Sequence, residues 1–242
     1  MYVGLLSLVR SLLTSPPEQH REVAKDSSFD DHGYIQGLIA NRGPCPGLNA
    51  LANHGYLPRD GQNLTLPQVE DALRTALHMD TVLASALTRS LRPLCRDKGT
   101  FDLRDLRRHN VVEHDASFTR LDFRQGDNYT FQPALFNALL DDADGGPVTI
   151  KSLAKTYVRR RKESEAVGSP KLPLNLWFVN LLQTVSFLNT AQMGGKLSRE
   201  TMTTFYTEER FPEEILKNKT PRTLFGLVGS ALILLFYIVF YT

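Results

Sequence analysis

Residues 42–61 read Arg-Gly-Pro-Cys-Pro-Gly-Leu-Asn-Ala-Leu-Ala-Asn-His-Gly-Tyr-Leu-Pro-Arg-Asp-Gly, which places Cys45 between two prolines. Pro46 suits the first position of a helix, because a proline there lacks only an N–H group that would have no partner. Apolar residues recur at helical spacing from Leu48, and Gly55 is a typical helix stop. Cys45 therefore lies at a helix N-terminus, where free N–H groups and the helix dipole favour a thiolate with a lowered pKa.

A rigid thiolate of this kind suits haem iron as an axial ligand, because it donates electron density that favours O–O cleavage. A buried structural cysteine in a proline-rich turn is the alternative if the Pro-Cys-Pro triplet is taken alone. The longer run closely resembles the haem-ligand segment of the fungal haem-thiolate peroxidases, the chloroperoxidase and unspecific peroxygenase family. The resemblance implies an all-α fold, one domain around a buried haem b, and Cys45 as the proximal iron ligand.

A second stretch, Glu113-His-Asp-Ala-Ser-Phe-Thr-Arg120, resembles the family's Glu-His-Asp-x-Ser-x-x-Arg signature. Taken alone, three such polar residues in a row are common on protein surfaces. In the family, the Glu carboxylate, the His main-chain carbonyl and the Ser hydroxyl bind a magnesium or manganese ion beside a haem propionate. The resemblance gives this role to Glu113, His114 and Ser117, whose oxygen atoms suit a hard cation. It also implies that the His114 side chain faces the distal pocket.

The family's distal glutamate, which moves a proton between the two peroxide oxygens, has no clear counterpart here. The best match to its segment places Gln183 at that position, and an amide is no general base near neutral pH. Three explanations stay open. Another acid enters the pocket, His114 itself serves as the base, or the protein runs different chemistry. The candidate acids are Glu163, Glu165, Asp141, Asp142 and Asp144.

The chain has 242 residues, with 28 basic and 26 acidic side chains and a formal net charge of +2. This balance offers no case for nucleic-acid binding, which usually needs a clustered basic face. We interpret the basic run at 159–162 as a solvated helix face. Cys45 and Cys95 are the two cysteines, so iron binding by Cys45 would leave no intrachain disulfide. The length suits one domain, expected over residues 33–215 after an N-terminal segment and linker over 1–32.

Several helices are expected beyond the cysteine segment. One amphipathic helix is predicted from Pro67 to Pro93, and Asp102 is expected to cap a short helix. Further helices are predicted over 135–140 and 149–161, and a last one follows Ser198, while residues 174–192 form an apolar stretch.

Residues 223–241 are apolar and lack charge, which predicts a C-terminal transmembrane helix. A buried C-terminal helix is the alternative. Lys217, Lys219 and Arg222 flank the segment, which predicts a tail anchor in the endoplasmic reticulum with the domain in the cytosol. Three Asn-x-Thr sequons, at Asn63, Asn128 and Asn218, would be used only in a secretory lumen. Membrane attachment suits an apolar substrate.

These observations predict a haem-thiolate peroxidase or peroxygenase that uses hydrogen peroxide to oxidise a small organic substrate, such as an apolar secondary-metabolite intermediate. The alternatives are a haem-thiolate enzyme of a biosynthetic pathway with non-peroxidative chemistry, or a membrane haem-binding protein without turnover. Gln183 keeps both alternatives open.

Overall fold

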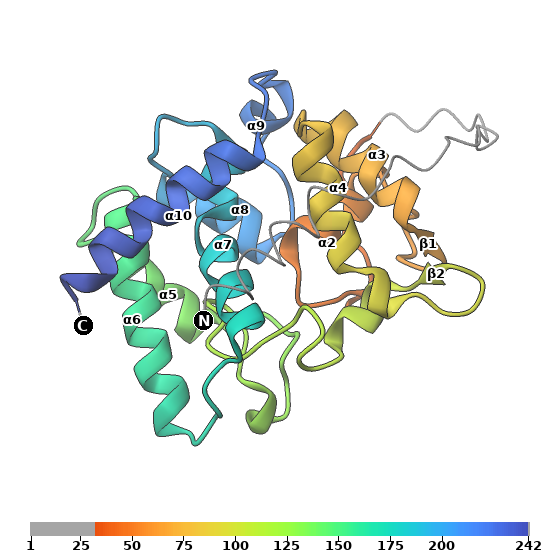
Figure 1. Cartoon of the computed structure of the whole chain (residues 1–242). Coiled ribbons are helices and arrows are strands. Elements are labelled where there is room, and N and C mark those ends of the chain that lie inside the picture. The colour runs from red at the N-terminus through yellow and green to blue at the C-terminus, as the bar shows by residue number, and fades with distance from the viewer. Residues whose placement is uncertain (1–31, 242) are drawn as a thin grey trace. The chain divides into compact units, whose positions relative to one another are not determined.

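The computed structural model describes residues 32–241, which are mostly helical, as predicted (Figure 1). The α-helices are α2 Pro46–Asn53, α3 Leu66–Leu77, α4 Thr81–Ser90, α5 Pro133–Asp141, α6 Ile150–Ala166, α7 Leu174–Ala191, α8 Arg199–Thr207, α9 Glu213–Lys217 and α10 Leu224–Val239. Two short strands, β1 Leu64–Thr65 and β2 Thr100–Phe101, pair antiparallel with Leu64 opposite Phe101. The predicted all-α class is therefore confirmed, with this small hairpin as an addition.

The single helix predicted from Pro67 to Pro93 is wrong, because the chain forms two helices there. Helix α3 ends at His78, which adopts a left-handed conformation with φ of 48°. Helix α4 then begins after Asp80, whose carboxylate accepts a hydrogen bond of 2.7 Å from the backbone N–H of Leu83. An aspartate that caps a helix start is a strong local signal, and it outweighs the apolar periodicity that runs through the break.

Helices α5, α6 and α8 confirm the predicted helical segments in the second half of the chain, and α7 lies within the apolar stretch 174–192. Thr149 caps α6, and Ser198 caps α8 by accepting the N–H of Thr201 at 3.0 Å. The interpretation of 159–162 as a solvated face is wrong for Arg160, which is 4% exposed. Its guanidinium is turned inward because Asp122, which is fully buried, lies 3.1 Å away.

Helix α10 packs along α6 and α7 (Figure 1). Its inward face is buried through Leu227, Ala231 and Leu234. Its outward face carries exposed apolar side chains, namely Phe225, Val228, Leu232, Ile233, Phe236 and Val239. The predicted transmembrane helix is not supported: over residues 32–241, no helix is long and apolar enough to cross a bilayer. Helix α10 has 16 residues. The location in the endoplasmic reticulum stays a prediction.

Arg222, which was expected to be a flanking positive charge, is fully buried and belongs to the fold. Its Nε donates to the carbonyl of Thr190 at 2.8 Å, and its Nη2 donates to the carbonyl of Ile215 at 3.1 Å. Its Nη1 donates to the carbonyls of Asn218 and Thr220. The guanidinium thus satisfies carbonyls at the ends of α7 and α9, where helices leave such groups unpaired.

The three sequons differ in accessibility. Asn63 is exposed and Asn218 is partly exposed, whereas Asn128 is 6% exposed and donates to the carbonyl of Arg107 at 3.1 Å. In the folded chain, the Asn128 side chain is therefore not available for modification.

Candidate active site

Cys45 occupies the N-cap of α2, as predicted, with φ of −84° and ψ of 105°. Burial raises the pKa of its thiol, and the backbone N–H groups of Leu48 and Gly47 act in the opposite direction. Burial is the larger effect, so the predicted lowering of this pKa is wrong. A thiol that coordinates a metal is deprotonated outright, and the two N–H groups then stabilise the charged sulfur.

The Glu-His-Asp signature lies in a loop that buried polar groups hold in place. Asp122 accepts hydrogen bonds from the N–H of Ala116 at 2.9 Å and from the hydroxyl of Ser169 at 2.7 Å. The carboxylate of Asp115 accepts the N–H of Phe123 at 2.8 Å. Arg160 donates from Nε to the carbonyl of Ser117 at 2.7 Å. The loop has no helix or strand of its own, so these contacts fix its geometry.

His114, at the centre of this loop, is 3% exposed. Its Nδ1 lies 2.8 Å from the carbonyl oxygen of Asp115 and 3.4 Å from the amide nitrogen of Asn180 on α7. Burial lowers the pKa of the imidazole, and the carbonyl of Asp115 and the side chain of Gln183 act against that shift. The imidazole is therefore neutral near pH 7 and faces helix α7, where the family resemblance placed the distal side.

Gln183 lies on the same helix one turn after Asn180, and it is exposed. The structure thus brings together His114 and Gln183, the two residues predicted for the distal side. Asn180 was missed, because only the packing of α7 on the signature loop shows its contact with His114. The signal available in sequence was its spacing of three residues from Gln183, which places both side chains on neighbouring faces of one helix.

The alternative acids do not converge on His114. Glu163 is paired with Arg159 and Arg160, at 2.8 and 2.7 Å. Asp142 is also paired with Arg159, and Asp144 with Lys155. The remaining two, Asp141 and Glu165, are exposed. Each paired carboxylate is held on or beside α6 by its basic partner.

The predicted cation ligands are brought together only in part. The hydroxyl of Ser117 donates to the main-chain carbonyl of His114 at 3.1 Å, so these two oxygens are neighbours. Glu113 instead lies 2.8 Å from Nδ1 of His109. Burial raises the pKa of the Glu113 carboxyl, and the hydrogen bond with His109 opposes that shift.

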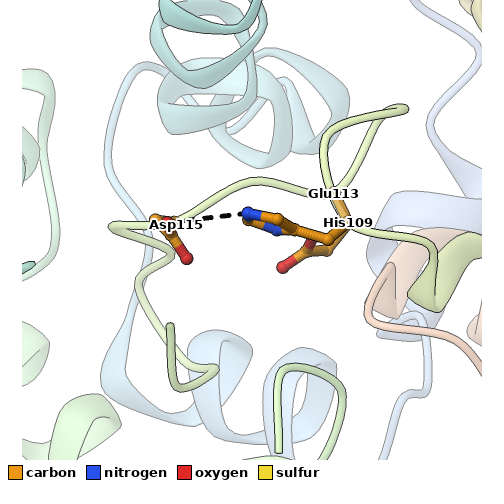
Figure 2. A group of neighbouring side chains, drawn as sticks. All are labelled: His109, Glu113 and Asp115. Atoms are coloured by element: carbon orange, nitrogen blue, oxygen red, sulfur yellow. Dashed lines mark hydrogen bonds and ion pairs between the residues drawn. The ribbon is translucent and has the colours of Figure 1, made fainter. Parts of the chain in front are cut away.

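His109, Glu113 and Asp115 form a compact group whose ligand atoms all lie within 4.8 Å of one another (Figure 2). The Nε2 atom of His109 is 3.8 Å from the carboxylate of Asp115, and its ring stacks on Phe123 at 4.3 Å. His109 was missed, although its position four residues before Glu113 is the one available signal. The group has the donor atoms that a divalent cation accepts.

The residues around these loops fit a bound haem. Three of the buried polar atoms that lack a hydrogen-bond partner within the described residues are Nε2 of His114, Oδ1 of Asn180 and Nε of Arg120. Buried polar atoms are normally hydrogen-bonded, so these atoms suit contact with a further polar group. The charge of Arg120 also acts on the Cys45 sulfur. The thiol of Cys45 at a helix N-terminus is a suitable thiolate donor for haem iron, and the unpaired Nε2 of His114 suits a polar group bound nearby.

Comparison with known proteins assigns the family. The model of Peroxidase, family 2 matches residues 32–220. An aromatic peroxygenase of Coprinellus radians is 30% identical over 206 residues, which cover 73% of this chain and 78% of that protein. An aromatic peroxygenase of Cyclocybe aegerita is 27% identical over 224 residues, or 77% of this chain and 57% of that protein.

A further relative has a higher identity to this chain, but over a much shorter stretch. A dothistromin biosynthesis peroxidase of Dothistroma septosporum is 56% identical over 36 residues, which cover 14% of this chain and 9% of that protein. The family model spans most of the chain, and the Coprinellus relative aligns over most of its own length. The chain therefore belongs to peroxidase family 2, the haem-thiolate peroxidases and peroxygenases of fungi.

Proposed function

We propose that this chain is a peroxygenase that uses hydrogen peroxide to oxidise an apolar organic substrate, with Cys45 as the haem ligand and His114 as the acid–base group. The observation that carries the proposal is the orientation of His114. Its Nδ1 is engaged by the carbonyl of Asp115 at 2.8 Å, while Nε2 makes no hydrogen bond of ordinary geometry within residues 32–241.

This orientation fixes which nitrogen can accept a proton. A carbonyl only accepts hydrogen bonds, so Nδ1 carries the ring proton and Nε2 presents its lone pair. Burial lowers the pKa of His114, which keeps the ring neutral and able to accept a proton at pH 7. Haem bound through Cys45 would supply the redox chemistry. Nε2 of His114 then takes a proton from one peroxide oxygen and returns it to the other.

Asn180 and Gln183 complete this side as hydrogen-bonding groups. The Asn180 amide contacts the His114 ring at 3.4 Å, and its Oδ1 atom makes no hydrogen bond in the described part of the chain. The side chain of Gln183 raises the pKa of the same ring. Amides bind and orient peroxide without taking its proton, so these residues position the oxidant and leave proton transfer to the imidazole.

We further propose a divalent cation, magnesium or manganese, in the signature loop. Glu113, the main-chain carbonyl of His114 and the hydroxyl of Ser117 supply oxygen ligands of the kind that these ions prefer. For Glu113 to bind, its carboxylate exchanges the hydrogen bond with His109 for the ion. The neighbouring Asp115 carboxylate adds negative charge that favours a cation at this position.

The proposed substrate is a secondary-metabolite intermediate with aromatic or other apolar surface. Two relatives are named aromatic peroxygenases, and a third is named for dothistromin biosynthesis. Gln183 in place of an acid favours one second candidate, a haem-thiolate enzyme of a biosynthetic pathway that does not consume peroxide.

The test uses the full chain loaded with haem, mixed with hydrogen peroxide and a small aromatic hydrocarbon. We expect peroxide-dependent product, and a rate of peroxide consumption about 100-fold lower in His114→Ala than in the parent chain. Gln183→Ala serves as the matched variant, and its rate of peroxide consumption should fall far less than that of His114→Ala. A haem-loaded parent chain with a thiolate-type spectrum that forms no product would overturn the peroxygenase proposal. Equal rates in the parent and His114→Ala would remove His114 from its role.

A further inference from the structure

A partly buried carboxylate, that of Glu209, connects the cysteine loop to the signature loop. It follows α8 and has a left-handed backbone with φ of 49°, which is unusual for a residue other than glycine. Its Oε1 atom accepts hydrogen bonds from Nδ2 of Asn49 at 2.8 Å and from Nη2 of Arg120 at 3.0 Å. One oxygen thus receives donors from two segments that lie far apart in the sequence.

Asn49 carries this contact to the cysteine loop. It is fully buried, its Oδ1 accepts the N–H of Gly43 at 3.1 Å, and its Nδ2 donates to the carbonyl of Gly43 at 2.8 Å. The backbone N–H of Asn49 also donates to the carbonyl of Cys45 at 3.1 Å. Asn49 therefore closes the loop from residue 43 to the first turn of α2, and Glu209 holds Asn49 in that position.

The main chain of Glu209 is also anchored to α2. The carbonyl of Glu209 accepts Nδ2 of Asn53, one turn after Asn49 on α2, at 3.1 Å. Oδ1 of Asn53 in turn accepts Nη2 of Arg42 at 2.7 Å. Arg42 is 1% exposed and begins the segment that carries the cysteine. Main-chain and side-chain contacts together fix Glu209 against the helix that presents the sulfur.

Two opposite charges, those of Glu209 and Arg120, therefore act on the sulfur. Arg120 is 3% exposed, and its side chain forms an ion pair with Glu209. Both charges act on Cys45, with Glu209 raising the pKa of the thiol and Arg120 lowering it. The side chain of Arg120 is 3% exposed and that of Glu209 is 16% exposed, so solvent screens their influence on the sulfur only in part.

We propose that Glu209 is a positioning residue for the proximal cysteine: it holds the Cys45 loop through Asn49, and its charge, balanced by Arg120, sets how strongly the sulfur donates electrons to haem iron. This inference rests on Cys45 as the iron ligand. A negative charge behind a thiolate favours the oxidised iron, and a positive charge favours the reduced iron. Glu209 and Arg120 should therefore shift the midpoint potential of the iron in opposite directions.

The test measures the ferric–ferrous midpoint potential of the haem-loaded full chain by spectroelectrochemistry. Glu209→Gln keeps an oxygen for Asn49 but removes the negative charge, and we expect a higher potential. Arg120→Met removes the positive charge and should lower it. The double variant should return toward the parent value. Glu208→Gln is the matched control, because Glu208 pairs with Arg210 at 2.7 Å on the exposed side and should leave the potential unchanged.

Opposite shifts support the proposal, because a loop that is merely loosened would move the potential in the same direction in both variants. Shifts of the same sign, or no shift, would overturn it. If Glu209→Gln does not retain haem, the Arg120→Met variant decides: a lower potential supports the proposal, and an unchanged or higher potential overturns it. A parent chain whose ferrous carbon monoxide complex lacks a thiolate-type spectrum would instead refute Cys45 as ligand. That outcome is distinct from flat potentials in a chain with a normal thiolate spectrum.

Discussion

The Nδ1 atom of His114 lies 2.8 Å from the carbonyl oxygen of Asp115, the next residue in the chain. The ring is thus oriented by the main chain of its own loop. That loop is fixed by Asp122 and Arg160, which are both buried. A main-chain acceptor cannot be removed by substitution, so the direction of Nε2 depends on the fold of the signature loop as a whole.

Gln183→Glu should increase the rate of reaction with peroxide at least about 10-fold, because it places a carboxylate beside His114 where a general base contributes most. The measurement is stopped-flow absorbance in the Soret band of the haem-loaded chain. Gln183→Ala is the control and should give no increase. A haem-loaded Gln183→Glu chain that reacts no faster would show that residue 183 does not face the distal side.

Leu234→Ala should lower the free energy of unfolding by about 2–5 kcal/mol, because Leu234 is fully buried between α10 and its neighbours. Leu232→Ala removes the same group from the exposed face of the same helix, where 62% of the residue is accessible, and should cost less than about 0.5 kcal/mol. Urea unfolding followed by circular dichroism compares them. Equal small effects would mean that α10 is not docked on the domain in solution.

Arg222→Met should destabilise the chain by about 3 kcal/mol or more, because buried carbonyls of α7, α9 and the following turn lose their donor. Lys219→Met is the matched control, since Lys219 is exposed and should shift the unfolding midpoint little. Thermal and urea unfolding both report the difference. Similar midpoints for the two variants would contradict the structural role of Arg222.

The free energy of unfolding should fall as pH drops below about 6.5, because burial lowers the pKa of His54 and the folded state disfavours its charged form. The unfolded chain binds the proton first, so the stability is present above the unfolded pKa and is lost toward the folded pKa. The slope is at most about 1.4 kcal/mol per pH unit for one proton. His54→Gln should flatten part of this slope in urea titrations at pH 5–8. His114 contributes with the same sign, and an unchanged slope in His54→Gln would exclude His54.

The sequence was informative where local chemistry dominates. The N-cap position of Cys45 and the helix start at Ser198 follow from residue type and spacing, and the structure confirms them. The extent of α3 differs from the prediction, because the apolar spacing continues past Asp80, which caps a new helix. The prediction of a transmembrane helix at the C-terminal segment used hydropathy alone. Hydropathy contains no information on the packing of α6 and α7 against one face of α10.

The rest of the site depends on long-range contacts. Asn180 meets His114 across 66 residues, Arg120 meets Glu209 across 89, and Asn49 meets Glu209 across 160. A local pattern carries no signal for such pairs. The signature motifs predicted which loops matter, while the partners that orient those loops became visible only in the folded chain.

The corner between α3 and α4 has a consequence for the order in which the chain can fold. The carbonyl of His78 accepts the N–H of Arg222 at 3.0 Å, and the N–H of Asp80 donates to the carbonyl of Arg222 at 2.8 Å. Both partners are in place only after residue 222 has been synthesised, more than a hundred residues later. During translation, the backbone groups of His78 and Asp80 therefore lack these partners until residue 222 has been added. Contacts of this sequence separation slow folding. The contacts that complete the corner between α3 and α4 thus come from the segment that leads into α10.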